Sequence, residues 1–532
     1  MKKKQLLALC LAGLLTGSLA ACKGNTDGPQ GGEYELAIYA VNLGDGIGWV
    51  QGLMEGFKNE PWVKEKYPEL TYYFQYNDSE AYATDLMEGG KGGNPYDLMF
   101  GAYLSQYSSP DMVYDMAESV YNAIIPGEGV TVKSKMSEEM IQNKATQNAA
   151  GGTSYYSINW SASLEGIAYN AEKLAAMGYE MPVTTDELLA VSAAISEKDG
   201  YAWLSSREGN GYWSYMFNPL VAQYMTPEGY RNFFNGIDQY GRMSNKIFES
   251  KASLRVMEFM EELFKYDTSA KKYKYLYSGS DDLDYMAAQL QFYKGTGVFM
   301  PNGSWLETEM SNLVQKAQAA GQKTYDIRFM KYPIISAIIE VLPDKTITDD
   351  ATLAAVVRAV DAGETSYAGV SEDDFAYIAE ARAVVKYVND LDCCIPAYSD
   401  SKELAADFLI YAASENGIKA YYQGSNTPSP FYYDVKAKAP DIYNNMSSFG
   451  RSRIDIMYGN ALYEWEVSVP STNTRMASYG GIALTRMDYK SFYGNFSQPD
   501  TSNIVSAQEI WQETKDYWTA ERFSEALRQA GY

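Results

Sequence analysis

The chain has 532 residues, of which 68 are acidic and 44 basic; its formal net charge is −24, and it contains no histidine. This charge disfavours binding to nucleic acids and broad attachment to anionic lipid headgroups, because both depend on basic patches. Without histidine, Ser/His/Asp and Cys/His nucleophile systems and histidine-containing metal sites are excluded. The chain is long enough to bury more than one core, and we expect two lobes.

The N-terminus has the features of a secretory signal. Three lysines precede a short apolar run over residues 6–15, and small residues lead up to Cys22. The run is too short to span a bilayer. The segment resembles the signals of bacterial lipoproteins, which implies cleavage before Cys22, acylation of that cysteine and a membrane tether. An ordinary secretory signal is the alternative, and export follows in both cases.

We therefore assign residues 1–21 to a signal peptide and residues 22–32 to a flexible tether. The tether is rich in glycine and contains a proline, which suits a segment without a packed core. Cleavage would leave 511 residues with 41 basic and 68 acidic side chains, so the net charge becomes −27.

Strand and helix signals alternate at the start of the folded body. We predict strands over residues 35–41, 70–76 and 96–102, with helices over 49–57 and 79–88. This order is typical of a mostly parallel α/β sheet, whose ligand-binding groups gather in loops at the carboxyl ends of the strands. The candidate ligand-binding residues in these loops are Asn42, Asp45, Asp78 and Tyr103.

Each of these polar residues also has a structural alternative, since Asp, Asn and Ser cap helices. The glycine-rich run over residues 44–48 lacks the Lys-Ser/Thr of a phosphate loop and the glycine spacing of a dinucleotide fingerprint. We interpret it as a flexible turn from strand to helix that can still touch a ligand.

The elements that follow predict a second lobe, which begins near residue 158. Residues 155–169 have an extended pattern and 170–177 that of a short helix. Thr184 to Glu187 have the sequence of a capping box before an apolar-periodic helix. Longer helices are expected over residues 253–266, 282–293 and 306–320.

No metal or cofactor motif is present, and no disulfide framework is possible. Within the folded body the only cysteines are the neighbours Cys393 and Cys394. We expect two reduced, buried thiols, because adjacent Cα atoms are closer than a disulfide prefers; a vicinal redox switch is the alternative. Paired carboxylates could still support glycoside hydrolysis, but pairs such as Asp281-Asp282 are expected by chance among 68 acidic residues.

Four segments, taken in order, resemble the family 1 extracellular solute-binding proteins of ABC importers, to which maltose-binding protein belongs. The most specific reads Phe-Tyr-Lys-Gly-Thr-Gly-Val-Phe-Met at residues 292–300 and leads to Gly303-Ser304-Trp305. The others are Asn-Pro-Tyr-Asp-Leu-Met-Phe at 94–100, Glu-Gly-Ile-Ala-Tyr-Asn at 165–170 and Ser-Lys-Glu-Leu-Ala-Ala-Asp-Phe-Leu at 401–409.

The resemblance implies an α/β fold of two hinge-linked lobes with a ligand cleft between them. It places residues 33–157 and 386–430 in the first lobe, and 158–385 and 431–532 in the second. Residues 334–385 form an insertion where relatives have a short connection, and we predict helices there over 349–362 and 373–388.

The composition favours a sugar ligand. Tyrosine outnumbers phenylalanine 47 to 19, and such rings stack on the apolar face of a pyranose while their polar tips bind hydroxyls. The alternative for any one ring is a place in the core. The aromatic candidates, placed by the resemblance or by nearby glycine-rich loops, are Trp160, Tyr212, Trp213, Trp305 and Trp465.

We therefore predict a non-catalytic receptor that captures a carbohydrate, preferably an oligosaccharide, and delivers it to an ABC permease. Closure of the lobes around the ligand would be the signal to the permease. We expect a monomer on the outer face of the cytoplasmic membrane, without cofactor or metal. A receptor for another solute, such as a peptide, and a surface glycoside hydrolase are the alternatives, because fold alone does not fix the ligand.

Overall fold

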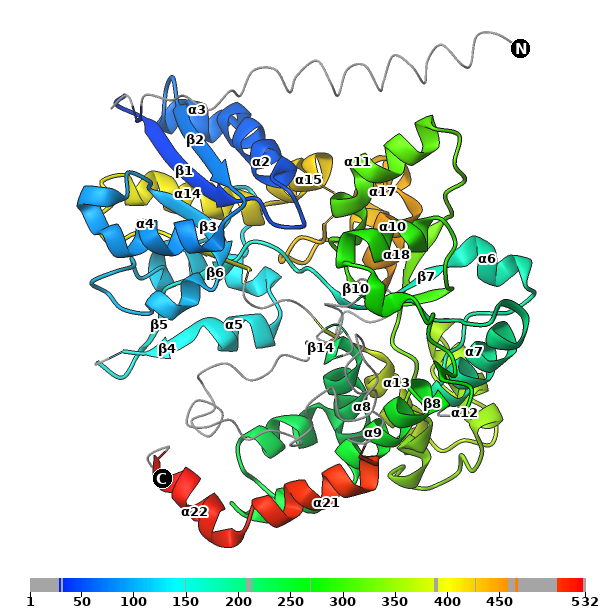
Figure 1. Ribbon diagram of the computed structural model, residues 1–532. Helices are drawn as coiled ribbons and strands as arrows, with labels where there is room; N and C mark the ends of the chain where they lie inside the picture. The colour runs from blue at the N-terminus through cyan, green and yellow to red at the C-terminus, as the bar shows by residue number, and fades with distance from the viewer. Residues whose placement is uncertain are drawn as a thin grey trace.

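The computed structural model shows two lobes side by side (Figure 1). It describes residues 28–29, 32–148, 150–206, 212, 214–267, 269–386, 391–425, 427–457, 465–466 and 505–529. The predicted signal peptide, Cys22 and most of the tether lie outside these residues.

The first lobe is built on a five-stranded sheet with the order β2-β1-β3-β13-β6. β1, β2 and β3 are parallel, as the alternating sequence pattern predicted, and β13 returns antiparallel between β3 and β6. The carboxyl ends of β1, β2 and β3 therefore share one edge of the sheet, which faces the second lobe (Figure 1). The strands are β1 Glu35–Val41, β2 Thr71–Asn77, β3 Leu98–Ala102, β6 Ile158–Asn159 and β13 Leu391–Cys394.

Helices cover both faces of this sheet. α2 and α15 pack so closely that a Cβ on Gly48 would lie 2.1 Å from the Gly424 carbonyl oxygen, and one on Gly52 2.4 Å from that of Ala420. Glycine is required here because backbone meets backbone. The first-lobe helices are α2 Gly48–Asn59, α3 Pro61–Lys66, α4 Glu80–Gly93, α5 Glu138–Lys144, α14 Lys402–Ala413 and α15 Glu415–Gly424, with a hairpin of β4 Ala145–Gln147 and β5 Thr153–Tyr155.

The second lobe has a three-stranded sheet with the order β10-β7-β11, in which both neighbours run antiparallel to β7. Its strands are β7 Glu165–Asn170, β10 Phe299–Gly303 and β11 Ile327–Met330. The helices around it are α6 Ala171–Ala176, α7 Thr185–Asp199, α8 Ser214–Phe234, α9 Ala252–Leu263, α10 Tyr285–Tyr293, α11 Leu306–Ala319, α16 Val435–Lys438, α17 Pro440–Asn445, α18 Ser448–Met457, α21 Ala507–Tyr517 and α22 Ala520–Gln529. Two short pairs complete it: β8 Tyr266–Asp267 with β9 Lys272–Tyr273, and β12 Val384–Val385 with β14 Trp465–Glu466.

The predicted insertion is ordered and packs on the second lobe. It contains α12 Asp350–Asp361 and α13 Glu372–Arg382, and the chain then enters β12 instead of continuing as a helix to residue 388. Arg358 of α12 forms two hydrogen bonds of 2.9 Å with the carboxylate of Glu187 on α7. That carboxylate also accepts from the Val183 N–H, so Glu187 joins the insertion to the start of α7 instead of closing the predicted capping box with Thr184.

Three segments that pass between the lobes are bonded to one another. The Trp160 N–H donates to the Leu391 carbonyl (3.1 Å), Ala162 to Pro428 (3.0 Å) and Glu165 to Lys386 (3.0 Å). Residues far apart in the sequence thus form one connection between the lobes.

The contact between α2 and α15 yields a stability prediction. Gly52→Ala should lower the free energy of unfolding by more than about 2 kcal/mol, because a methyl group would be forced against a carbonyl oxygen of another helix. Gly89→Ala is the matched control, since Gly89 is exposed in α4 with no atom within 4 Å of its added Cβ; it should leave stability unchanged or raise it by about 0.5–1 kcal/mol. Urea denaturation followed by circular dichroism measures both, and equal effects would contradict this account.

Candidate functional site

The two lobes touch where the loop after β1 meets the start of α11. Gly44 lies so close to the second lobe that an added Cβ would be 2.6 Å from the Cβ of Trp305 and 2.9 Å from Oε1 of Glu309. A Cβ on Gly46 would reach Thr308 at 3.3 Å. The glycine-rich turn predicted over residues 44–48 is therefore the part of the first lobe that closes against α11.

Trp305 lies at the predicted junction of strand and helix, between β10 and α11. A Cβ on Gly303 would be 2.2 Å from the indole, so the ring lies against the backbone of β10 and needs glycine beneath it. Tyr212 and Tyr215 meet the indole at steep angles, 73° and 89°, with ring centroids 6.4 and 6.1 Å away. Three large rings thus gather at the lobe contact.

Tyr215, which the sequence analysis did not select, organises this cluster. Its ring stacks on Tyr212 at 5.0 Å, and the Lys386 ammonium lies 5.1 Å from its centroid. Burial raises the pKa of Tyr215, and the nearby Tyr212, Glu309 and Tyr103 act in the same direction. Tyr103, which is 54% exposed after β3 in the first lobe, is thus close enough for its charge to act on Tyr215.

Asp45 is buried behind the Gly44 turn. Its carboxylate accepts hydrogen bonds from the hydroxyls of Ser163 and of Thr427, the latter at 3.1 Å, and both donors belong to the crossing segments. Burial raises the pKa of Asp45, against the opposing effects of these bonds and of the Arg453 charge. Arg453 is itself fully buried, donates to the Ser304 carbonyl and lies 3.6 Å from Glu307.

Glu309 is the polar residue at the contact that sequence reasoning missed. Its position one helical turn after Trp305 was the available signal, because residues four apart share a helix face. Burial raises the pKa of Glu309 and the charge of Asp45 adds to this, while a hydrogen bond from Gln289 opposes both.

Asn42 and Asp78 lie together at the same sheet edge. The Asn42 Nδ2 donates to Oδ1 of Asp78 at 2.7 Å. The structure gives the capping role to Ser79, whose hydroxyl accepts from the Tyr82 N–H at the start of α4. The Asp78 carboxylate therefore remains at the exposed edge.

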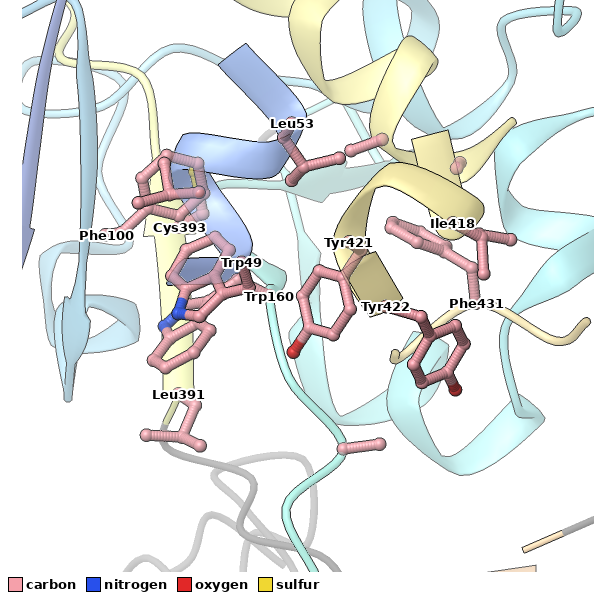
Figure 2. Packing of buried hydrophobic residues seen from close by; sticks show 14 of the residues in the cluster. Trp49, Leu53, Phe100, Trp160, Leu391, Cys393, Ile418, Tyr421, Tyr422 and Phe431 are labelled. Atoms are coloured by element: carbon pink, nitrogen blue, oxygen red, sulfur yellow. The ribbon is translucent and has the colours of Figure 1, made fainter. Parts of the chain in front are cut away.

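Three other aromatic candidates are placed differently or lie outside the described side chains. Trp160 is in the core of the first lobe, 4% exposed, stacked on Trp49 at 4.3 Å and bonded to the Gly101 carbonyl (Figure 2). A ring packed in this way cannot present that face to a ligand. Trp213 lies outside the described residues, and for Trp465 only the backbone is described, paired with Val384.

The described residues include two free cysteines and contain neither a metal-binding cluster nor a membrane-spanning helix. Cys393 and Cys394 are buried, free thiols on opposite faces of β13, as the strand alternation requires. Within the described ranges no group of three or more acidic or cysteine side chains is arranged to hold a metal ion. None of the described helices is both long enough and apolar enough to cross a membrane.

The family is decided by a match of residues 68–445 to the sequence profile of bacterial extracellular solute-binding proteins. The chain belongs to this family. As a solute-binding protein of the extracellular class it acts outside the cytoplasm and is a binding protein rather than an enzyme. The predicted recognition and fold class are thereby confirmed. No curated protein matches the chain.

Solved structures of solute-binding proteins share the two-lobe fold at low identity. RafE of Streptococcus pneumoniae is 13% identical with a TM-score of 0.54, covering 92% of this chain and 99% of its own. A structure from work on xylan utilisation by Caldanaerobius polysaccharolyticus is 11% identical with a TM-score of 0.52, and the match covers 91% of this chain and 100% of that one. A substrate-binding protein of Listeria monocytogenes in complex with cycloalternan is 12% identical with a TM-score of 0.51, and the match covers 93% of this chain and 99% of that one.

The position of Glu309 predicts a pH dependence of lobe closure in this solute-binding protein. Parting the lobes exposes Glu309 to water, so its pKa is higher in the closed form than in the open one. Closure is therefore favoured by protonation: this contribution is fully present below the ordinary pKa of 4.5 and is lost as the pH rises through the raised pKa.

Small-angle X-ray scattering from about pH 4 to about pH 8 should show the radius of gyration increasing with pH. Glu309→Gln should remove part of the increase and leave the part due to Asp45. Identical pH profiles for the two proteins would contradict the prediction.

Proposed function

We propose that this solute-binding protein captures an oligosaccharide between its lobes and delivers it to an ABC permease. The observation that carries the proposal is the cluster of Trp305, Tyr212 and Tyr215 at the lobe contact, with the exposed Tyr103 of the first lobe near it. Aromatic faces bordered by carboxylates are what a sugar needs, since its C–H face stacks and its hydroxyls donate.

The polar part of the proposed site comes from the first lobe. Asn42 and Asp78 follow adjacent parallel strands and form an exposed pair at one edge of the sheet, whereas Asp45 is buried behind the Gly44 turn and contributes its charge. The structure from work on xylan utilisation, the chitin oligosaccharide binding protein and the cycloalternan complex are each named for a carbohydrate, and this supports a sugar ligand here. A peptide ligand on the same fold is the alternative that the experiment below distinguishes.

We further propose that residues 1–21 are removed and that acylated Cys22 anchors the protein, as a monomer, on the outer face of the cytoplasmic membrane. The sequence places the lobes at residues 33–157 with 386–430 and at 158–385 with 431–532. Because β6 pairs in the first-lobe sheet and Trp160 stacks on Trp49 of α2, we propose that the first lobe extends through residue 160. Trp213 and Trp465 remain proposed ligand contacts on the basis of the sequence.

Trp305→Ala should abolish or strongly weaken sugar binding. Loss of the ring removes a stacking platform, and we expect an affinity roughly 10- to 100-fold lower. A thermal-shift screen of residues 33–532 against mono- and oligosaccharides, with short peptides as controls, measures this, because a ligand bound to the native state raises the melting temperature.

Gly303→Ala is a second variant for the same test, because its Cβ would displace the indole without removing it. It should weaken binding in the same direction as Trp305→Ala. Stabilisation by peptides alone, or full sugar affinity in both variants, would overturn the carbohydrate proposal.

Cys22→Ser should release the protein from the membrane. Thioether-linked acylation needs the cysteine sulfur, and without lipid the chain loses its anchor. Cell fractionation and labelling with a clickable palmitate analogue check this: wild type should be labelled in the membrane fraction and the variant should be unlabelled. A variant that remains membrane-bound would contradict the proposed anchor.

A further inference from the structure

Glu309 lies at the lobe contact, and a hydrogen bond from a buried side chain of its own lobe holds its carboxylate in place. Its Oε2 accepts a hydrogen bond from Nε2 of Gln289 at 3.0 Å, and Gln289 is fully buried on α10. The Gln289 Oε1 is buried without a hydrogen-bond partner among the described residues, so this bond to Glu309 is what fixes the amide. With Oε2 bonded to Gln289, the Oε1 of Glu309 lies next to Gly44 of the first lobe.

The carboxylate shares its surroundings with the proposed stacking ring. Trp305 and Glu309 are four residues apart at the start of α11 and lie on the same face of the helix. Gly44 approaches both of them. A ligand that enters between Gly44 and α11 would therefore meet the Oε1 of Glu309 beside the side chain of Trp305.

The charges at this junction are predominantly negative. Asp45 is buried on the opposite side and raises the pKa of Glu309 through its charge. The cations described there are already engaged, since Lys386 pairs with Glu165, and Arg453 binds the Ser304 carbonyl and Glu307. A ligand group next to Glu309 therefore meets an acceptor and a negative field.

We propose that Glu309 contacts the sugar and selects uncharged or cationic sugars against acidic ones. The inference rests on the function proposed above. Sugar hydroxyls, or an amino group, donate to Oε1 and satisfy it, whereas a uronate or phosphate group is repelled by Glu309 and Asp45 in a site shielded from water. Glu309 thus determines specificity in a way that Trp305 cannot, because a ring stacks on charged and uncharged sugars alike.

Isothermal titration calorimetry with matched probes tests this. The probes are xylotriose and xylotriose carrying a glucuronic acid branch, and the trimer of N-acetylglucosamine and its deacetylated, cationic form. Wild type should bind the acidic member of the first pair at least about 10-fold more weakly than the neutral one. The deacetylated trimer should bind at least as tightly as the acetylated one.

Glu309→Gln keeps the size of the side chain and can still bond to Gln289, but it removes the charge. It should weaken binding of the uncharged trimers by about 10-fold and bring the neutral-to-acidic ratio towards one. Glu172→Gln is the matched control: it removes one charge from an exposed pair with Lys323 on the same lobe and should leave the ratio unchanged.

The possible results distinguish a failure of the selective role of Glu309 from a failure of the proposed sugar-receptor function. If the acidic sugar binds as tightly as the neutral one, or if Glu309→Gln and Glu172→Gln give the same ratio, the selective role of Glu309 is wrong while a sugar receptor stands. If no sugar of any charge binds, the proposed function fails and the inference fails with it. The melting temperature of each variant confirms that it is folded.

Discussion

The contact between the lobes depends on two glycines, which let the backbone approach the side chain of Trp305 more closely than a residue with a Cβ could. At Gly44 the first lobe meets Trp305, and at Gly303 the strand makes room for the indole itself. Any larger residue at these two positions would either hold the lobes apart or push the ring out. The geometry of the proposed site is thus set by two glycines, whereas the aromatic residues supply the surface.

Buried charge is the second constraint on the lobe contact. Asp45 accepts from hydroxyls of two crossing segments, and Arg453 reaches the same region from α18. Hydrogen bonding from the crossing segments makes the buried carboxylate tolerable, so movement of these segments and solvation of Asp45 are coupled. Closure of the lobes is for this reason an electrostatic event as well as a steric one.

Much of the fold followed from local patterns in the sequence. β1 has the predicted bounds, the helix after Thr184 begins where its cap requires, and Trp305 lies at the expected turn from strand to helix. These features depend on residues close in sequence. The end of α13 was missed because pairing of β12 with β14, a long-range contact, replaces helix there.

The site was harder to predict because it depends on which residues meet across the cleft. Trp160 is the kind of residue on which a sugar ring can stack, yet Trp49 of α2 covers its face. Glu309 and Tyr215 belong to helices whose patterns reveal amphipathic packing but not the residue opposite. Gln289, Gly44 and Asp45 give Glu309 its environment, and they come from distant parts of the chain.

The position of β13 has a consequence for the order in which the molecule can be completed. This strand lies between β3 and β6 although it is encoded after the sheet and most of the helices of the second lobe, and α15, which packs on α2, comes later still. During synthesis from the N-terminus, the lobe that starts first therefore remains without a central strand until residues 391–424 have been made. Until then β3 and β6 have open edges, so the first lobe cannot complete its sheet before much of the second lobe has been made.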